Sequence, residues 1–163
     1  MPDIRLIAYS LAALVFAADR ATKWLVESRM SFTDVYTVIP GFFDIVHTQN
    51  TGIAFGLFAN STSEWRTLIL VVLSAGALGL VGYMLWGAPR MDRRSVAGLA
   101  LILGGAAGNV FDRIMWGRVT DFLEFYAGSL HWPTFNVADS AIVVGSALLL
   151  MDLMRPKRQP ART

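Results

Sequence analysis

The run from Thr67 to Trp86 contains no charged residue. Crossing a bilayer core about 30 Å thick takes about 20 helical residues, and this run is long enough. Backbone polar groups in lipid must bond within their own segment, which favours an α-helix. The run therefore predicts a transmembrane helix, and it restricts the chain to folds that a membrane-embedded protein can adopt.

Further apolar runs follow the same pattern, so we expect four membrane spans in a single domain over residues 1–163. The composition agrees, with 55% hydrophobic and 16% charged residues and a mean hydropathy of +0.50. The first run imitates a cleavable signal peptide, but Asp19 and Lys23 continue its helical pattern and other spans follow, so we interpret it as retained. The last two are short, which would put their polar ends at the interface. The expected spans are 4–24, 67–86, 95–111 and 137–154.

Lysine and arginine residues indicate the orientation of these spans, because they gather in cytoplasmic loops. If the spans alternate, one side receives Arg5, Arg90, Arg93, Arg94, Arg155, Lys157, Arg158 and Arg162. Both termini and the loop between the second and third spans would then be cytoplasmic. The longer loops, about 27–66 and 112–136, would face outside, and the basic tail 156–163 is expected to be disordered.

Polar residues inside the spans gather at the outer end, apart from Asp152 at the cytoplasmic end. Charges in lipid are costly and are usually retained for a function, so a one-sided cluster indicates a site. Polar residues that only cap helices would instead be found at both ends of the spans. The clustered residues are Asp19, Lys23, Asn109, Asp112, Arg113, Asn136 and Asp139.

Each part of this cluster also has a simpler interpretation. Asp19 and Lys23 are spaced i, i+4, so they can be an interfacial ion pair with Lys23 extended outward. Arg113 can favour the C-terminal dipole of its helix. Asp121, in the second outer loop on a β-favouring run, can simply be solvated, although its distance along the chain allows it to meet Asp139.

Two local patterns predict packing and capping. Gly104 and Gly108 form a small-xxx-small spacing that lets another helix approach closely. Asn136 with Asp139 resembles an N-cap with an acidic N3 partner.

The first outer loop is too long to be structureless in a compact protein. Its segment "DVYTVIPGFFDIVHTQNTG" has the Val, Ile, Thr and aromatic content of short strands, with turns at Pro40-Gly41 and Asn50-Thr51-Gly52. We expect a small extracytoplasmic β-sheet within about residues 30–62. The following "IAFGLF" is either a short flexible lid or part of the buried face of that sheet.

Several classes of function lack their motifs. The chain has no Cys and two His, without an HExxH zinc motif. It also lacks a GxSxG nucleophile elbow, a P-loop lysine and a nucleic-acid-binding motif. A Ser-Lys mechanism would have to use Lys23. The remaining candidates are a carboxylate-based enzyme, a small four-helix transporter or carrier, and a lipid-binding assembly subunit.

The motifs together resemble the bacterial lipoprotein signal peptidases, also called signal peptidase II. They are D-x-x-x-K from Asp19, "NTGIAF" from Asn50, "GNVFDR" from Gly108, "VTDF" from Val119 and "FNVADS" from Phe135. All of them occur in order. Arg20, Asp44 and Gln49 stand at positions where we expect the family to vary.

This resemblance implies an aspartic endopeptidase of the bacterial inner membrane. Its substrate would be a diacylglyceryl-modified prolipoprotein, cut just before the lipidated Cys, with no metal, cofactor or nucleic acid required and membrane lipids as surroundings. We expect a monomer with the catalytic dyad Asp121 and Asp139, of which Asp139, near a helix N-terminus, is the ionised member. Site-shaping or substrate-binding residues would be Asp19, Lys23, Asn50, Gly52, Asn109, Asp112, Arg113 and Asn136.

Overall fold

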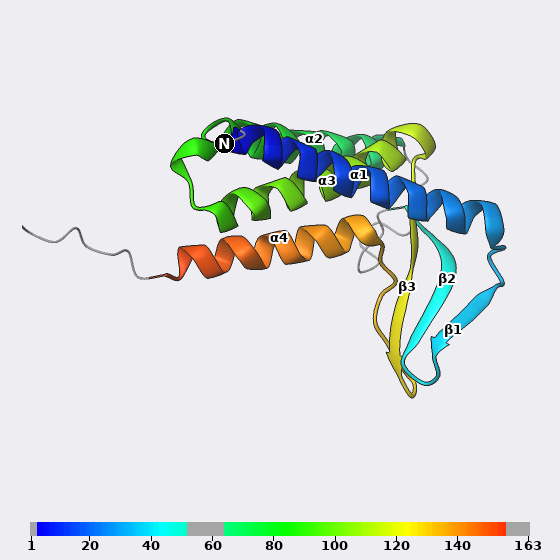
Figure 1. Ribbon diagram of the computed structural model, residues 1–163. Helices are drawn as coiled ribbons and strands as arrows, with labels where there is room; N and C mark the ends of the chain where they lie inside the picture. Colours follow the sequence, from blue (N-terminus) through cyan, green and yellow to red (C-terminus); the bar gives the residue numbers. More distant parts are fainter. Residues whose placement is uncertain (1–2, 52–63, 156–163) are drawn as a thin grey trace, which may run out of the picture.

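The computed structural model describes residues 3–51 and 64–155 and is mainly α-helical with a small sheet (Figure 1). The helices are α1 (Ile4–Arg29), α2 (Glu64–Trp86), the 3-10 helix η2 (Ala88–Arg90), α3 (Arg93–Trp116) and α4 (Val137–Leu153). The strands are β1 (Val35–Ile39), β2 (Phe43–Asn50), β3 (Val119–Ala127) and β4 (Leu130–His131). Helices with a small β-sheet were predicted, and this part of the fold class is confirmed.

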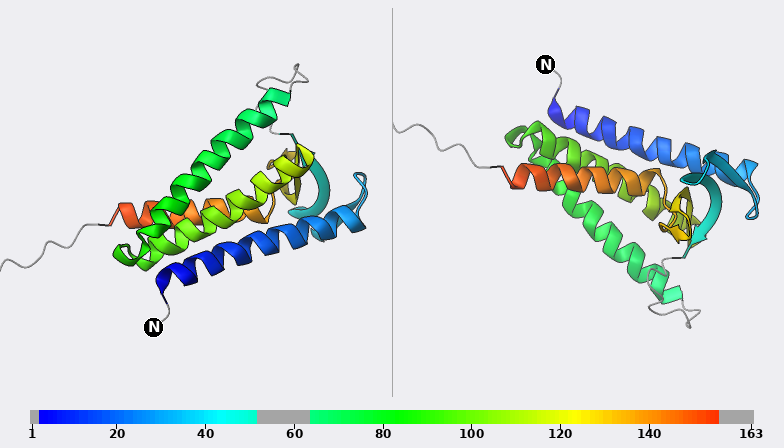
Figure 2. Two further views of the ribbon diagram at one scale, coloured as in Figure 1. Left: turned by 90° about the horizontal axis from the view of Figure 1, so that it is seen from above. Right: turned by 90° about the horizontal axis from the view of Figure 1, so that it is seen from below.

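Helix α3 is the centre of the helical layer, because it packs against α1, α2 and α4. Helix α2 approaches α3 at its Trp86 end and splays away towards its Glu64 end (Figure 2). The first turn of α1 and the last turn of α4 lie at one end of the layer, and the sheet projects from the other (Figure 1). Two helical segments of the described residues are long and apolar enough to cross a membrane, Leu68–Trp86 of α2 and Arg93–Trp116 of α3. The prediction of four spans stays a prediction.

Glycines allow α3 to approach its neighbours closely. A Cβ on Gly104 would lie 2.4 Å from the Ala12 carbonyl oxygen of α1, and a Cβ on Gly105 would lie 2.4 Å from the Ala138 carbonyl oxygen of α4. Any larger side chain would therefore push these helices apart. The close approach predicted from Gly104 and Gly108 is confirmed, with α1 as the partner.

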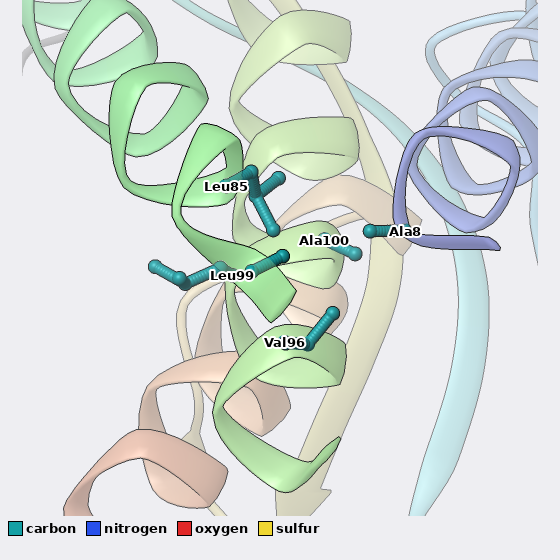
Figure 3. Packing of buried hydrophobic residues seen from close by; sticks show 6 residues of the cluster. Ala8, Leu85, Val96, Leu99 and Ala100 are labelled. Atoms are coloured by element: carbon teal, nitrogen blue, oxygen red, sulfur yellow. The ribbon is translucent and has the colours of Figure 1, made fainter. Parts of the chain in front are cut away.

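The buried apolar core lies near the start of α1 and α3 and the end of α2, remote from the sheet. Leu85 of α2 and Ala8 of α1 pack there against Val96, Leu99 and Ala100 of α3 (Figure 3). At the opposite end, Val26 and Met30 pack against Phe122 of β3 and join α1 to the sheet. The polar ends of the helices are thus held against the strands.

The sheet is antiparallel with the order β1-β2-β3-β4. A register shift between Ile45 and Thr48 of β2 places Thr48 opposite Asp121 and Gln49 opposite Thr120. The β-sheet predicted from the sequence was confined to about residues 30–62, in the first long loop. Strands β3 and β4 come instead from the second long loop. That loop pairs because the β-favouring run around Asp121 supplies a partner for β2.

Two helices extend further than predicted. Helix α1 ends at Arg29 instead of Trp24, and α3 ends at Trp116 instead of Phe111. Asp112 and Arg113 are therefore helical and not part of a loop, whereas the length of the third membrane span stays a prediction. The helix continues because residues of α1 neutralise Asp112, and it ends at Gly117, whose φ of 68° favours glycine.

Candidate active site

The sequence-predicted polar residues converge where the C-terminal halves of α1 and α3 and the start of α4 meet β2 and β3. The hydrogen bonds and ion pairs described below connect them into one network. Gly52 and the predicted lid "IAFGLF" lie outside the described residues. The candidate site is built from Asp19, Lys23, Asn50, Asn109, Asp112, Arg113, Asp121, Asn136 and Asp139.

The first turn of α4 is fixed by a capping box. The Asp139 backbone N–H donates to Asn136 Oδ1 at 2.9 Å, and the Asn136 backbone N–H donates to Asp139 Oδ2 at 3.3 Å. The Ala138 N–H donates to Asp19 Oδ1 at 2.9 Å, so α1 caps this helix as well. These bonds satisfy donors that a helix N-terminus leaves open. The predicted cap is confirmed, and it holds Asp139 in place.

Two asparagine amides connect Asp121 with Asp139. Asn136 Nδ2 donates to Asp121 Oδ1 at 2.7 Å, and Asn109 Nδ2 donates to Asp139 Oδ1 at 2.7 Å. Asn136 Nδ2 also donates to Asn109 Oδ1 at 3.2 Å. Each aspartate therefore receives an N–H bond from a different asparagine, and the two amides are bonded to one another.

Lys23 sets the direction of the Asn109 amide. Its Nζ lies 2.9 Å from Asn109 Oδ1, 2.8 Å from Asp19 Oδ2 and 2.7 Å from Asp112 Oδ2. An ammonium group only donates, so the amide oxygen of Asn109 must face Lys23 and its N–H groups must face Asp139. The Asp19–Lys23 pair is confirmed, but Lys23 is 0% exposed, so the interpretation that it extends outward is wrong.

This arrangement also bears on a Ser-Lys mechanism. A lysine that activates a serine must lie within hydrogen-bond reach of its hydroxyl group. The three contacts of Lys23 are instead with two carboxylates and an amide oxygen, and no serine of the described part of the chain is among them. Lys23 is therefore placed to orient Asn109 and to neutralise carboxylates, and not to activate a serine.

Arg20 belongs to the same network, although the sequence did not single it out. Its guanidinium donates to Asp112 Oδ1. It also lies over the rings of Trp116 and Phe111, at 4.7 and 5.1 Å from the ring centroids. The sequence signal was a third charged residue beside Asp19 in an apolar run, but nothing in the local spacing identified its partner.

Arg113 supplies positive charge close to both aspartates. Its charge interacts with those of Asp139, Asp121 and Asp112, and its Nη1 donates to the Asn109 carbonyl oxygen at 3.3 Å. Its Nε is buried and has no hydrogen-bond partner among the described residues. The guanidinium can therefore donate to a negatively polarised atom brought between the carboxylates.

Asp121 is 2% exposed. Burial raises its pKa to about 6, and the nearby charge of Asp139 adds to this effect. Hydrogen bonds from Asn50 and Asn136 and the charge of Lys23 lower the pKa and offset part of the rise. The protonated form of Asp121 is therefore populated at mildly acidic pH.

The carboxylates of the network are bound by cations and amides of the protein, namely Asp19 and Asp112 by Lys23, Asp121 by Asn136 and Asp139 by Asn109. Among residues 3–51 and 64–155, no group of three or more His, Cys, Asp or Glu side chains is placed to hold a metal ion. The two His residues lie apart from Asp121 and Asp139: His47 contacts Met30, and His131 contacts Glu124.

Comparisons with known proteins show the family of this chain. The profile of the family described as Signal peptidase (SPase) II matches residues 11–155. A lipoprotein signal peptidase from Solibacter usitatus is 66% identical over 161 residues, covering 99% of this chain and 98% of the relative. A lipoprotein signal peptidase from Maridesulfovibrio salexigens is 40% identical over 93% of this chain and 97% of its own length.

A solved structure has the same fold. A bacterial membrane enzyme determined by the in meso method at 1.9 Å resolution superposes with a TM-score of 0.81. It is 25% identical, and the match covers 93% of this chain and 94% of that one. The protein is therefore a membrane protein, and both its sequence and its fold place it in the signal peptidase II family, the lipoprotein signal peptidases.

Proposed function

We propose that Asp121 and Asp139 form a catalytic dyad that cleaves diacylglyceryl-modified prolipoproteins just before the lipidated Cys. Membership of the family implies a peptidase acting on prolipoproteins. The observation that carries the dyad is the asparagine bridge, in which Asn136 donates to Asp121 and Asn109 donates to Asp139. Aspartic peptidases use two carboxyl groups that share one proton, since two close carboxylates do not readily ionise together.

The raised pKa of Asp121 supports the assignment of the proton to this residue. Asp139 lies in the first turn of α4, next to the positive end of the helix dipole. Asp139 would then act as the base and Asp121 as the acid. Because the two groups interact, their titration belongs to the pair.

The reaction balances with these two groups and one water. Asp139 takes a proton from water, and the water oxygen bonds to the scissile carbonyl carbon. Asp121 donates a hydrogen bond to the carbonyl oxygen and, as the C–N bond breaks, a proton to the leaving amine. Arg113 is placed to stabilise the negative charge that develops on the oxygen. Return of the proton from Asp139 to Asp121 restores the starting state.

The position of the site suits a lipidated substrate. Exposed tryptophans occur at the sheet end of the molecule, in Trp24, Trp116 and Trp132, and tryptophan is enriched where a membrane meets water. At that depth the acyl chains of a substrate can stay in lipid while the scissile bond meets water. We propose a monomer in the bacterial inner membrane, with four spans, both termini cytoplasmic and the dyad facing outward.

The carrier and the assembly-subunit alternatives do not account for the family match. A carrier would also be expected to hold its polar site near the bilayer midplane. The network here lies instead in the C-terminal halves of α1 and α3 and at the beginning of α4, towards the sheet.

The test is cleavage of a purified diacylglyceryl-modified prolipoprotein, followed by the shift of the product on a gel. Asp121→Asn and Asp139→Asn should each lower the rate by more than about a hundredfold, because each removes an acid-base group. Asp44→Asn is the matched control, since Asp44 is a buried sheet carboxylate that contacts Tyr126 at 3.4 Å outside the network. Full activity of either dyad variant would refute the proposal.

A further inference from the structure

A polar cavity of about 340 Å³ lies beside the sheet, on the side opposite to Asp121. Thr120 and its cross-strand partner Gln49 line the cavity. Asp121 pairs with Thr48, and successive residues of a strand point to opposite faces of a sheet. The β2–β3 pair therefore separates the cavity from the candidate dyad, so that the cavity is a second, distinct site.

His47 presents a hydrogen-bond acceptor to this cavity. The residue is 6% exposed, and its Nδ1 lies 2.8 Å from the Met30 carbonyl oxygen. A carbonyl oxygen only accepts, so Nδ1 carries the proton and the neutral ring has its lone pair on Nε2. This Nε2 is buried without a partner among the described residues, although buried polar atoms are normally bonded. A ligand that donates N–H or O–H would satisfy it.

The charged side chains lining the cavity are one carboxylate and one guanidinium, from Glu27 and Arg118. Thr120 Oγ1 donates to Glu27 Oε1 at 2.6 Å and so holds the carboxylate in place. Arg118 is exposed and makes no ion pair within the described part of the chain. These charges are complementary to a ligand that has one cationic and one anionic group.

Aromatic residues line the cavity near the end of a candidate membrane span. Trp116 lines it and is the last residue of α3, one of the helices long enough to cross a membrane. Exposed Phe32 lines it as well and lies against His47 in a tilted arrangement, with ring centroids 4.3 Å apart. Aromatic residues at the end of a span mark the membrane–water interface.

We propose that this cavity binds the headgroup of a phospholipid that carries a primary ammonium, such as phosphatidylethanolamine. The ammonium donates to the Glu27 carboxylate and to His47 Nε2, and the phosphate pairs with Arg118. A quaternary choline ammonium has no N–H and leaves His47 Nε2 unsatisfied. A glycerol headgroup carries no cation for Glu27.

Lipid retention by the purified, full-length protein tests this site. The protein in detergent is mixed with equal amounts of phosphatidylethanolamine, phosphatidylcholine and phosphatidylglycerol of the same acyl chains, and bound lipid is counted by native mass spectrometry. Phosphatidylethanolamine should be retained about tenfold more than phosphatidylcholine, as expected for charge-assisted hydrogen bonds. Glu27→Gln should abolish this preference. Glu124→Gln is the matched control, because Glu124 pairs with His131 away from the cavity and should change nothing.

Arg118→Gln keeps the proposal testable if the Glu27 variant fails to fold, because Arg118 is exposed. It should weaken retention of all three lipids, which share a phosphate, by a similar factor. Equal retention of phosphatidylethanolamine and phosphatidylcholine by the unmodified protein would overturn the proposal. So would equal competition by soluble O-phosphoethanolamine, which would assign the cavity to a free solute. A raised KM for prolipoprotein in Glu27→Gln, measured in phosphatidylcholine alone, would assign it to the peptide.

Discussion

Lys23 Nζ lies 2.9 Å from Asn109 Oδ1, and this contact determines that the Asn109 amide N–H groups face Asp139. The two residues are 86 positions apart in the chain. A buried cation on α1 thus controls how α3 presents a donor to a carboxylate on α4. Lys23 also pairs with Asp19 and Asp112. Burying these charges would be costly if any of them were unpaired.

Lys23→Met should destabilise the protein strongly. The substitution keeps the length of the side chain but leaves Asp19 and Asp112 without their shared cation, at 0% and 1% exposure. Removing one partner of a buried ion pair costs about 3–5 kcal/mol of unfolding free energy. Chemical denaturation in detergent measures this loss. Arg29→Met, on the exposed last turn of α1, is the control, and equal stability of the two variants would contradict the role of Lys23.

The rate of cleavage should fall as the pH rises through about 6. The pKa of Asp121 is raised to about 6, and the acid of the proposed mechanism must be protonated. A pH profile of kcat/KM in detergent measures the effect. An alkaline limb that is unchanged in Asn50→Ala would contradict the assignment to Asp121, because the Asn50 hydrogen bond lowers this pKa and its loss should move the limb upward.

The same group should make stability depend on pH. A raised carboxyl pKa means that the folded protein binds the proton more tightly than the unfolded chain, so stability is lost as the pH rises from 3.8 through about 6. Asp121→Asn removes this contribution. The decrease in unfolding free energy between pH 5 and pH 7 should therefore be smaller in the variant by about 1 kcal/mol. Identical pH dependence in the variant and the unmodified protein would show that the pKa of Asp121 is not raised.

Gly108→Ala should disrupt the site although it adds a single methyl group. A Cβ at this position would lie 2.4 Å from Asp19 Oδ2, so the carboxylate that caps α4 and pairs with Lys23 would have to move. We expect a loss of about 1–3 kcal/mol in unfolding free energy and a decrease in kcat. Gly79→Ala is the control, because a Cβ there has no neighbour within 4 Å. A fully active Gly108→Ala would show that α1 and α3 adjust freely.

Arg20→Ala should reduce activity through Asp112, without touching the dyad. The guanidinium of Arg20 pairs with Asp112 and covers Trp116, and Asp112 pairs in turn with Lys23. We expect kcat to fall by about tenfold with little change in KM, since loss of one charge-assisted bond is worth about 1.5–3 kcal/mol. Arg20→Lys should recover part of the activity by restoring the charge. No recovery by lysine would assign the effect to ring packing alone.

Local patterns in the sequence predicted the features that depend on neighbours within one helical turn. The uncharged run of α2, the Asp19–Lys23 pair at i, i+4 and the cap formed by Asn136 and Asp139 were all found in this way. The motifs also supplied the residues of the candidate site, because a family resemblance points to positions without giving their contacts. The physical reason is that helix capping and side-chain pairing act over three or four residues.

The tertiary structure decided how these residues contact one another. Arg20 meets Asp112 across 92 positions, and this partner lets α3 continue to Trp116 when the local pattern predicted an earlier end. Pairing of β3 with β2 put Thr120 on the face opposite Asp121, and this separates the cavity that Thr120 lines from the candidate dyad. A buried charge is stable only beside partners, and here these partners come from distant parts of the chain, so its position depends on the whole fold. The tendency to form each helix depends on the local sequence.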